Sequence, residues 1–255
     1  MFQILKYVVI DIIKNKIVIA YTVMLALFSW AIFGLENSSA KGMLTLLNII
    51  LLCVPLVSIL FSTIYVYNSS EFIELLLSHP IKRRKIWNAL FGGLSLSLSL
   101  AYILGTGIPL LIFAELSTAL IMIVSGILLS VIFVAVALLA GISARDKAKG
   151  IGVSIMTWLY FALLFDAIVL FLFFQFSEYP IEQAVVILSA FSPIDMCRIL
   201  ILLQLDVAAM MGFTGAIFKD LFGTQWGLIL AFGILLLWVL VPYFISLRIF
   251  SKRDM

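Results

Sequence analysis

Long apolar segments alternate with short polar segments along most of the chain. They cover residues 17–34, 43–66, 90–113, 119–142, 151–174 and 226–247. Each is close to the length of roughly 20 residues that a helix needs to cross a bilayer. The pattern therefore predicts an all-α integral membrane protein in which six transmembrane helices form a single domain, residues 1–255.

The residues before the first apolar segment follow a different pattern. Phe2, Leu5, Val9 and Ile12 recur at helical spacing, with Lys6 on another face. An amphipathic helix of this kind lies along a membrane surface. We expect an interfacial helix before the first span, and a plain extension of that span is the alternative.

Composition and charge agree with a membrane protein and set its orientation. Hydrophobic residues make up 65% of the sequence and charged residues 11%, whereas about one quarter of a globular protein is charged. If both termini are cytoplasmic, all 16 Lys and Arg residues except Lys41, Arg198 and Lys219 lie on the cytoplasmic side. This asymmetry follows the positive-inside rule. The net charge of +3 is therefore a topology signal, and no nucleic-acid partner is expected.

The polar segment at residues 68–88 separates the second and third spans. Asn68 is predicted to cap a short helix, with Glu71 as its capping-box partner. The helix is predicted to stop at His79, because the residue before Pro80 is disfavoured in the α region.

This short helix is predicted to carry an apolar ridge and to be followed by a charged anchor. Phe72, Leu75 and Leu76 share one face at helical spacing. Four consecutive cations, residues 82–85, then precede the third span. The segment is predicted to be a cytoplasmic docking element.

Residues 177–225 form the longest stretch outside the six apolar segments. Residues 184–205 are apolar enough for a further span, but they contain Pro193, Asp195 and Arg198. The two charges would cost about 5–7 kcal/mol at the bilayer centre. We therefore expect helices at the outer face that lie on the membrane or dip into it.

The start of one outer helix can be read from the sequence. Ser192 is suited to the N-cap, Pro193 to the first helical position and Asp195 to the first turn. A second helix is predicted to begin near Asp206, and Phe213 would be available for the membrane interface or a partner.

Two polar residues stand out inside the spans, Asp166 in the fifth and Asn48 in the second. An acid at this depth costs about 2.5–3.5 kcal/mol on the insertion scale, so Asp166 is expected to face protein or water. It either lies in a translocation path or at a moving dimer seam, or it bonds to a neighbouring helix.

Catalytic motifs are missing from the sequence. There is no GxxxxGK[ST] phosphate loop, so another chain must supply ATP hydrolysis. His79 is the one histidine and lies in the predicted cytoplasmic docking segment, which leaves no His-rich metal site and no triad. We expect a non-catalytic subunit without a cofactor of its own.

Sulfur-bearing side chains cluster in the outer segment. Met196, Cys197, Met210 and Met211 are predicted to lie outside the membrane. Thiol and thioether groups suit Cu(I), but methionine is also a common filler of apolar interfaces. The filler interpretation is preferred.

The stretch EFIELLLSHPIKRRKIWNAL, from Glu71 onward, resembles the first cytoplasmic loop of ABC-2 type permeases. In both, a glutamate, a Leu-rich run, a small residue, a proline and a basic cluster follow in that order. The resemblance implies a type V exporter-like permease whose coupling helix sits in a groove of a separate ATPase, which binds ATP and Mg²⁺. The coupling residues it implies are Glu71, Phe72, Glu74, Leu75, Leu76, His79, Pro80 and Arg83. An ordinary cytoplasmic loop whose charge only sets topology is the alternative.

The outer stretch SPIDMCRILILLQLDVAAMMGFTGAIF is similar to permeases of the complexes that supply copper to nitrous oxide reductase. Pro193, Asp195, Arg198, the LLQLD run ending at Asp206 and the MGFTGA run carry the similarity, and Ser192 replaces the usual asparagine. It implies a homodimer in the bacterial inner membrane with two cytoplasmic ATPases. A periplasmic β-helix copper-handling protein would bind the outer residues, including Phe213. A general exporter of a lipid, drug or sulfur species is the alternative.

Overall fold

The computed structural model describes residues 2–36, 38–144, 146–175, 188–204 and 225–252, and every element in these ranges is a helix. Six helices are long and apolar enough to cross a membrane. They are Lys16–Leu35, Ser39–Asn68, Arg83–Phe113, Leu116–Ser143, Lys147–Leu172 and Leu228–Lys252. The prediction of an all-α protein with six spans is confirmed.

Two of the spans contain a π-helical segment. The third consists of α5 (Arg83–Tyr102), η1 (Ile103–Gly107) and α6 (Ile108–Phe113). The fifth consists of α8 (Lys147–Leu159), η2 (Tyr160–Leu164) and α9 (Phe165–Gln175). The third span begins at Arg83 and not at residue 90, because no helix breaker follows Pro80 and the helix continues through the basic cluster.

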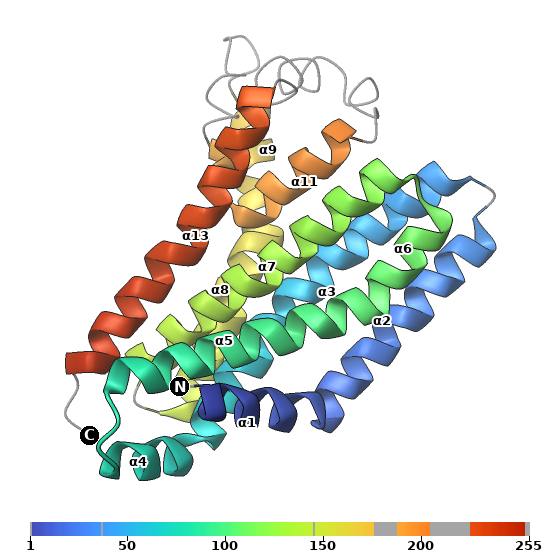
Figure 1. Cartoon of the computed structure of the whole chain (residues 1–255). Coiled ribbons are helices and arrows are strands. Elements are labelled where there is room, and N and C mark those ends of the chain that lie inside the picture. Colours follow the sequence, from blue (N-terminus) through green and yellow to red (C-terminus); the bar gives the residue numbers. More distant parts are fainter. Residues whose placement is uncertain (1, 37, 145, 176–187, 205–224, 253–255) are drawn as a thin grey trace.

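The core of the bundle forms around α7 (Leu116–Ser143), which packs against α3 (Ser39–Asn68), α5 and α13 (Gln225–Lys252) (Figure 1). Small residues allow this close packing. Gly126 of α7 lies under the ring of Tyr102, whose hydroxyl donates a hydrogen bond of 2.9 Å to the Met122 carbonyl. Gly105 of η1 similarly lies against the backbone of α2 (Lys16–Leu35). Small residues thus lie where the third span meets α7 and α2 most closely.

The N-terminal helix α1 (Phe2–Ile13) runs across one end of the bundle as a separate element (Figure 1). Val8 and Ile12 are fully buried, whereas Tyr7, Ile10 and Ile13 are exposed. The Asn15 side chain then caps α2 by accepting a hydrogen bond of 2.9 Å from the Ile17 amide. The predicted amphipathic helix is present, and a plain extension of the first span is excluded.

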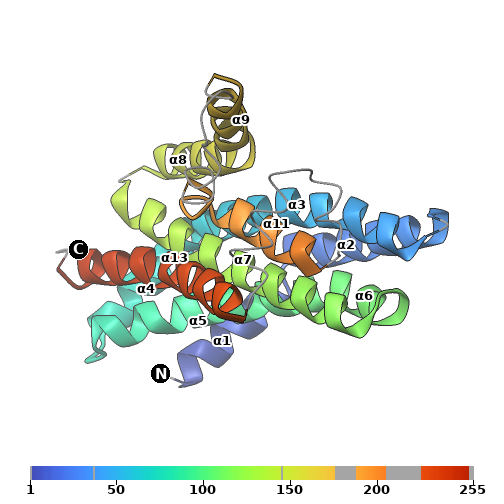
Figure 2. The same cartoon turned by 90° about the horizontal axis from the view of Figure 1, so that it is seen from above.

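The fifth span is set apart from the other helices. Seen from above, α8 lies beside α3 and α7, and α9 stands away from the remainder of the bundle (Figure 2). The ring of Phe161 in η2 packs edge-on against Trp238 of α13, with centroids 5.3 Å apart. The packed part of this span therefore ends near η2.

Candidate functional site

The short helix α4 (Ser70–Ser78) lies at the same end of the bundle as α1 and the C-terminal part of α13 (Figure 1). Ile73 anchors it and is only 5% exposed. Leu76 and Leu77 are half-buried against the core. The other face of the helix is directed away from the bundle.

The predicted ridge on α4 is divided between two environments. Phe72 stacks on Tyr7 of α1 with ring centroids 5.3 Å apart, so it holds α4 to the bundle. Leu75 is 58% exposed, and Glu71 and Glu74 are also exposed. Of the three residues in the predicted apolar ridge, Leu75 is the exposed one, because Phe72 packs on α1 and Leu76 packs against the core. Leu75 and the two glutamates remain accessible.

The C-terminal end of α4 is formed as Pro80 requires. His79 adopts an extended backbone with φ −88° and ψ 158°. The Ser78 hydroxyl donates to the Leu75 carbonyl at 2.7 Å, and His79 Nδ1 lies 3.0 Å from the same oxygen. His79 and Pro80 are exposed and Arg83 is half-buried at the start of α5. The predicted stop is confirmed.

The predicted capping box at the start of α4 was wrong. Asn68 is the last residue of α3, and Ser69 occupies the N-cap without a side-chain hydrogen bond. The Asn68 side chain instead accepts a hydrogen bond of 2.8 Å from Lys147 Nζ at the start of α8. Because the backbone bonds of α3 continue through the Ser69 amide, Asn68 is not free to cap the next helix.

The other end of the bundle carries α11 (Pro193–Gln204). The Ser192 hydroxyl accepts a hydrogen bond of 3.2 Å from the Asp195 amide, so the predicted N-cap is confirmed. The helix lies alongside α7 (Figure 1). Trp238 of α13 donates to the Ala190 carbonyl at 3.1 Å, which fixes the turn that precedes α11. The predicted helix therefore dips among the spans and does not lie flat above them.

The sulfur groups on α11 face the interior. Met196 and Cys197 are both fully buried, and Cys197 Sγ lies 3.9 Å from the Ser125 carbonyl oxygen. Both residues fill the contact between α11 and α7, as the filler interpretation predicts for them. Met210, Met211, Asp206 and Phe213 lie outside the described residues. Within the described part of the chain, no group of three or more His, Cys, Asp or Glu residues has metal-binding geometry.

A three-residue charge cluster joins α11 to the fifth span. Arg198 Nη1 lies 3.1 and 2.9 Å from the two carboxylate oxygens of Asp166 and 3.1 Å from Asp195 Oδ1. Their side chains are 31%, 33% and 11% exposed, in the order Arg198, Asp166 and Asp195. The guanidinium stays protonated in proteins and can bind two carboxylates at once. Of the two alternatives for Asp166, bonding to a neighbouring helix is the one observed.

The electrostatics of this Arg198 cluster are asymmetric. Burial raises the pKa of Asp195 above its usual range, and the nearby Asp166 carboxylate adds to the rise. Arg198 acts in the opposite direction. Asp166 lies in the first turn of α9, just beyond η2, and π-helical segments inside helices are frequent at functional sites. Sequence reasoning identified each of the three residues but not their association.

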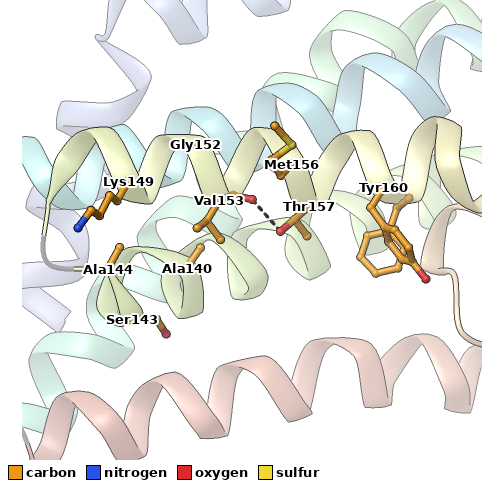
Figure 3. Close-up of a pocket in the computed structure, with 10 residues that line it drawn as sticks. Ala140, Ser143, Ala144, Lys149, Gly152, Val153, Met156, Thr157 and Tyr160 are labelled. Carbon is orange, nitrogen blue, oxygen red and sulfur yellow. Dashed lines mark hydrogen bonds between the residues drawn. The ribbon is translucent and has the colours of Figure 1, made fainter.

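An open groove of about 750 Å³ lies between the C-terminal end of α7 and the N-terminal half of the fifth span (Figure 3). Its lining is mostly apolar and consists of Ala140, Ser143, Ala144, Lys149, Gly152, Val153, Met156, Thr157, Tyr160 and Phe161. The Thr157 hydroxyl donates to the Val153 carbonyl at 2.8 Å within α8 and so has a partner inside its own helix. No pattern in the sequence predicted this groove, since its walls belong to two spans.

Comparisons with known proteins agree on one family. The sequence model described as ABC-2 family transporter protein matches residues 3–255. The probable ABC transporter permease protein NosY of Pseudomonas aeruginosa is 25% identical over 220 residues. This alignment covers 78% of the present chain and 80% of the relative.

Proposed function

The chain belongs to the ABC-2 family of transporter proteins, and we propose that it transmits the movement of a cytoplasmic ATPase to the opposite face of the membrane. It is a multi-pass permease component of an ABC transporter. Its proposed partner hydrolyses ATP with Mg²⁺, and both termini are proposed to be cytoplasmic.

The observation that carries this proposal is the exposed face of α4. Leu75, Glu71 and Glu74 are accessible on a helix that is fixed at its other face by Ile73 and by the stacking of Phe72 on Tyr7. A rigidly anchored amphipathic helix can insert into a groove of a partner through such a face. The exposed apolar contact would supply affinity, and the glutamates would orient the helix.

A chain of contacts runs from α4 to the fifth span. Tyr67, near the end of α3, donates to the carbonyls of Gly141 and Ala144 at 3.0 and 3.1 Å. One turn earlier, Thr63 Oγ1 lies 2.7 Å from Ser154 Oγ of α8, and both side chains are fully buried. Movement of α4 therefore has a packed route through α3 into α8.

The route would continue through the Arg198 cluster to the outer face. Asp166 lies on the same span as Ser154, and Arg198 binds it to α11. We propose that displacement of the fifth span moves α11 and the outer segment that follows it. Mutations in the Arg198 cluster test this coupling directly.

A homodimer is proposed from the polar surface of α3. Asn48 is exposed within a span and makes no side-chain hydrogen bond within the described ranges. An unpaired amide in hydrocarbon is costly, and such residues form hydrogen bonds between membrane helices. A second copy of the chain packed against α3 and the separated fifth span would bury it.

The proposed role in copper-site assembly rests on the similarity to the NosY permease. On this proposal a periplasmic β-helix copper-handling protein binds the outer segment, whose first helix carries Pro193, Asp195 and Arg198. This chain would change the shape of that partner from the membrane. The system would serve maturation of nitrous oxide reductase.

A general ABC-2 exporter of a lipid, drug or sulfur species is the second candidate. It is favoured by the open apolar groove of about 750 Å³ between α7 and α8. In a dimer, a groove of this size and lining can hold a hydrophobic cargo.

Co-purification from the native membrane in mild detergent tests both candidates. Recovery of an ATPase together with a repetitive β-helix protein would support the copper-assembly role. An ATPase alone would favour the general exporter. Recovery of neither, from membranes in which the chain is intact, would contradict the proposed transmission function.

A further inference from the structure

A second cavity, of about 380 Å³, lies where the start of α5 meets the end of α13. It is distinct from the α7–α8 groove and from the Arg198 cluster. Its lining residues are Arg84 from α5 and Phe244, Leu247, Arg248, Ser251 and Lys252 from α13. Cations and apolar side chains thus surround one space.

The walls of the cavity are held rigidly. Trp87 is buried and stacks on Phe250 with ring centroids 4.3 Å apart. Its indole Nε1 donates to the Ser246 hydroxyl at 3.0 Å. The Tyr243 hydroxyl donates to Asn88 Oδ1 at 2.6 Å. These contacts fix α13 against α5 beside the cavity.

The charge around the cavity is not compensated within the described part of the chain. Arg84, Arg248 and Lys252 are all exposed, and none forms a salt bridge with a described carboxylate. Three cations facing one space repel each other unless an anion lies between them. The arrangement therefore favours an anionic ligand.

The apolar lining indicates that the ligand also has a hydrophobic part. Leu247 is half-buried, and Phe244 is 58% exposed beside the cavity. Exposed side chains continue from it along α13, including Val241 and Leu237. This surface belongs to a membrane-spanning helix and would face acyl chains. A ligand that fits both the cationic and the apolar lining is amphiphilic, with an anionic head and a hydrocarbon tail.

We propose that this cavity binds an anionic phospholipid, with the headgroup phosphate between Arg84, Arg248 and Lys252 and one acyl chain along Phe244 and Leu247. Basic pockets between membrane helices bind anionic headgroups in this way. The basic cluster at residues 82–85 lies at the same corner, directly after the α4 element. A bound lipid would bridge α5 and α13 next to the proposed ATPase contact. The binding itself does not depend on the copper-assembly role.

Native mass spectrometry of the full chain in detergent tests the proposal. The protein is mixed with equal amounts of phosphatidylglycerol and phosphatidylcholine, and the lipid that stays bound is measured. Wild type is expected to retain phosphatidylglycerol selectively. The variant with Arg84→Gln, Arg248→Gln and Lys252→Gln is expected to bind phosphatidylglycerol about a hundredfold more weakly, since about fivefold is expected for each of the three charges.

A matched variant removes the same charge elsewhere. Lys6, Lys14 and Lys16 are exposed on or near α1, and changing all three to Gln should leave selective retention unchanged. Equal loss in both triple variants would overturn the site in favour of general charge attraction. If the cavity variant fails to fold, Arg248→Gln alone should lower retention about fivefold, and unchanged retention would overturn the proposal.

Two further experiments distinguish a bound lipid from a free anion and from a protein partner. Inorganic phosphate at the lipid concentration should not displace phosphatidylglycerol, because it makes no apolar contact. Displacement by phosphate would identify an anion site without lipid specificity. Unchanged lipid retention, combined with loss of ATPase co-purification in the cavity variant, would assign these cations to protein docking and overturn the lipid proposal.

Discussion

Replacing Arg198 is the sharpest test of how α11 is held to the fifth span. Its single Nη1 nitrogen makes three contacts of 2.9–3.1 Å to the carboxylates of Asp166 and Asp195. Arg198→Met keeps an unbranched apolar stem but removes the guanidinium group and its charge. The substitution leaves two carboxylates close together without a cation between them.

The expected loss follows from the geometry and the burial. Removing one partner of a fully buried ion pair costs about 3–5 kcal/mol. Arg198 and Asp166 are each about one third exposed, so their charges are partly solvated. A hydrogen bond to a charged group contributes about 1.5–3 kcal/mol. We therefore expect Arg198→Met to lower the free energy of unfolding by about 2–3 kcal/mol.

Thermal unfolding in detergent measures this loss. A change of that size shifts Tm by roughly 4–12 °C in a chain of this length. Adding Asp166→Asn to Arg198→Met should restore about 1 kcal/mol, because it removes one of the two facing carboxylates. Lys41→Gln, at an exposed position on α3, is the matched control and should change stability by less than about 0.5 kcal/mol. An unchanged Tm for Arg198→Met, or no increase in Tm on adding Asp166→Asn, would refute the proposal that Arg198 joins α11 to the fifth span.

Three other predictions concern docking, packing and orientation. Leu75→Asp should reduce ATPase co-purification at least tenfold without changing Tm, because this exposed side chain does not stabilise the fold. Gly126→Ala should lower the free energy of unfolding by about 1–3 kcal/mol, because the new Cβ would lie 2.2–2.5 Å from atoms of the Tyr102 side chain. Gly233→Ala is the matched control, since its Cβ would meet no atom within 4 Å. Thermal unfolding should show the control to be neutral or stabilising. A membrane-impermeant maleimide should label Lys41→Cys in intact cells and Lys14→Cys only after lysis.

Each of these has an outcome that contradicts it. Full ATPase recovery with Leu75→Asp would remove α4 as the docking element. Equal Tm values for the two glycine variants would mean that the Tyr102 contact is not tight. Labelling of Lys14→Cys in intact cells would reverse the proposed orientation.

The helical fold and several helix ends were predictable because their causes are local. Each span is recognised from the summed transfer free energy of adjacent residues, which does not depend on which neighbours it packs against. The stop at His79 follows from steric exclusion by Pro80, and the start of α11 from the Ser192 cap. The capping box at Asn68 failed because continuation of α3 and Lys147 competed for the same residue.

The candidate sites were only half predictable. Phe72, Leu75 and Leu76 were identified as one ridge, but α1 covers part of it. The direction in which Met196 and Cys197 point was not predicted, and α11 turns both onto α7. The rotation of a short helix about its axis depends on the surface it meets, and that surface is not encoded next to it in the chain.

The sequence alone thus determined the membrane class, the six spans, the separate N-terminal helix and the positions of the polar residues that membrane insertion makes costly. Only the tertiary structure decided that Asp166 meets Arg198, that Leu75 stays accessible, and that cations from α5 and α13 share a cavity. The physical reason is that insertion free energy adds up along the chain, whereas ion pairs and cavities depend on how distant helices cross and turn toward each other.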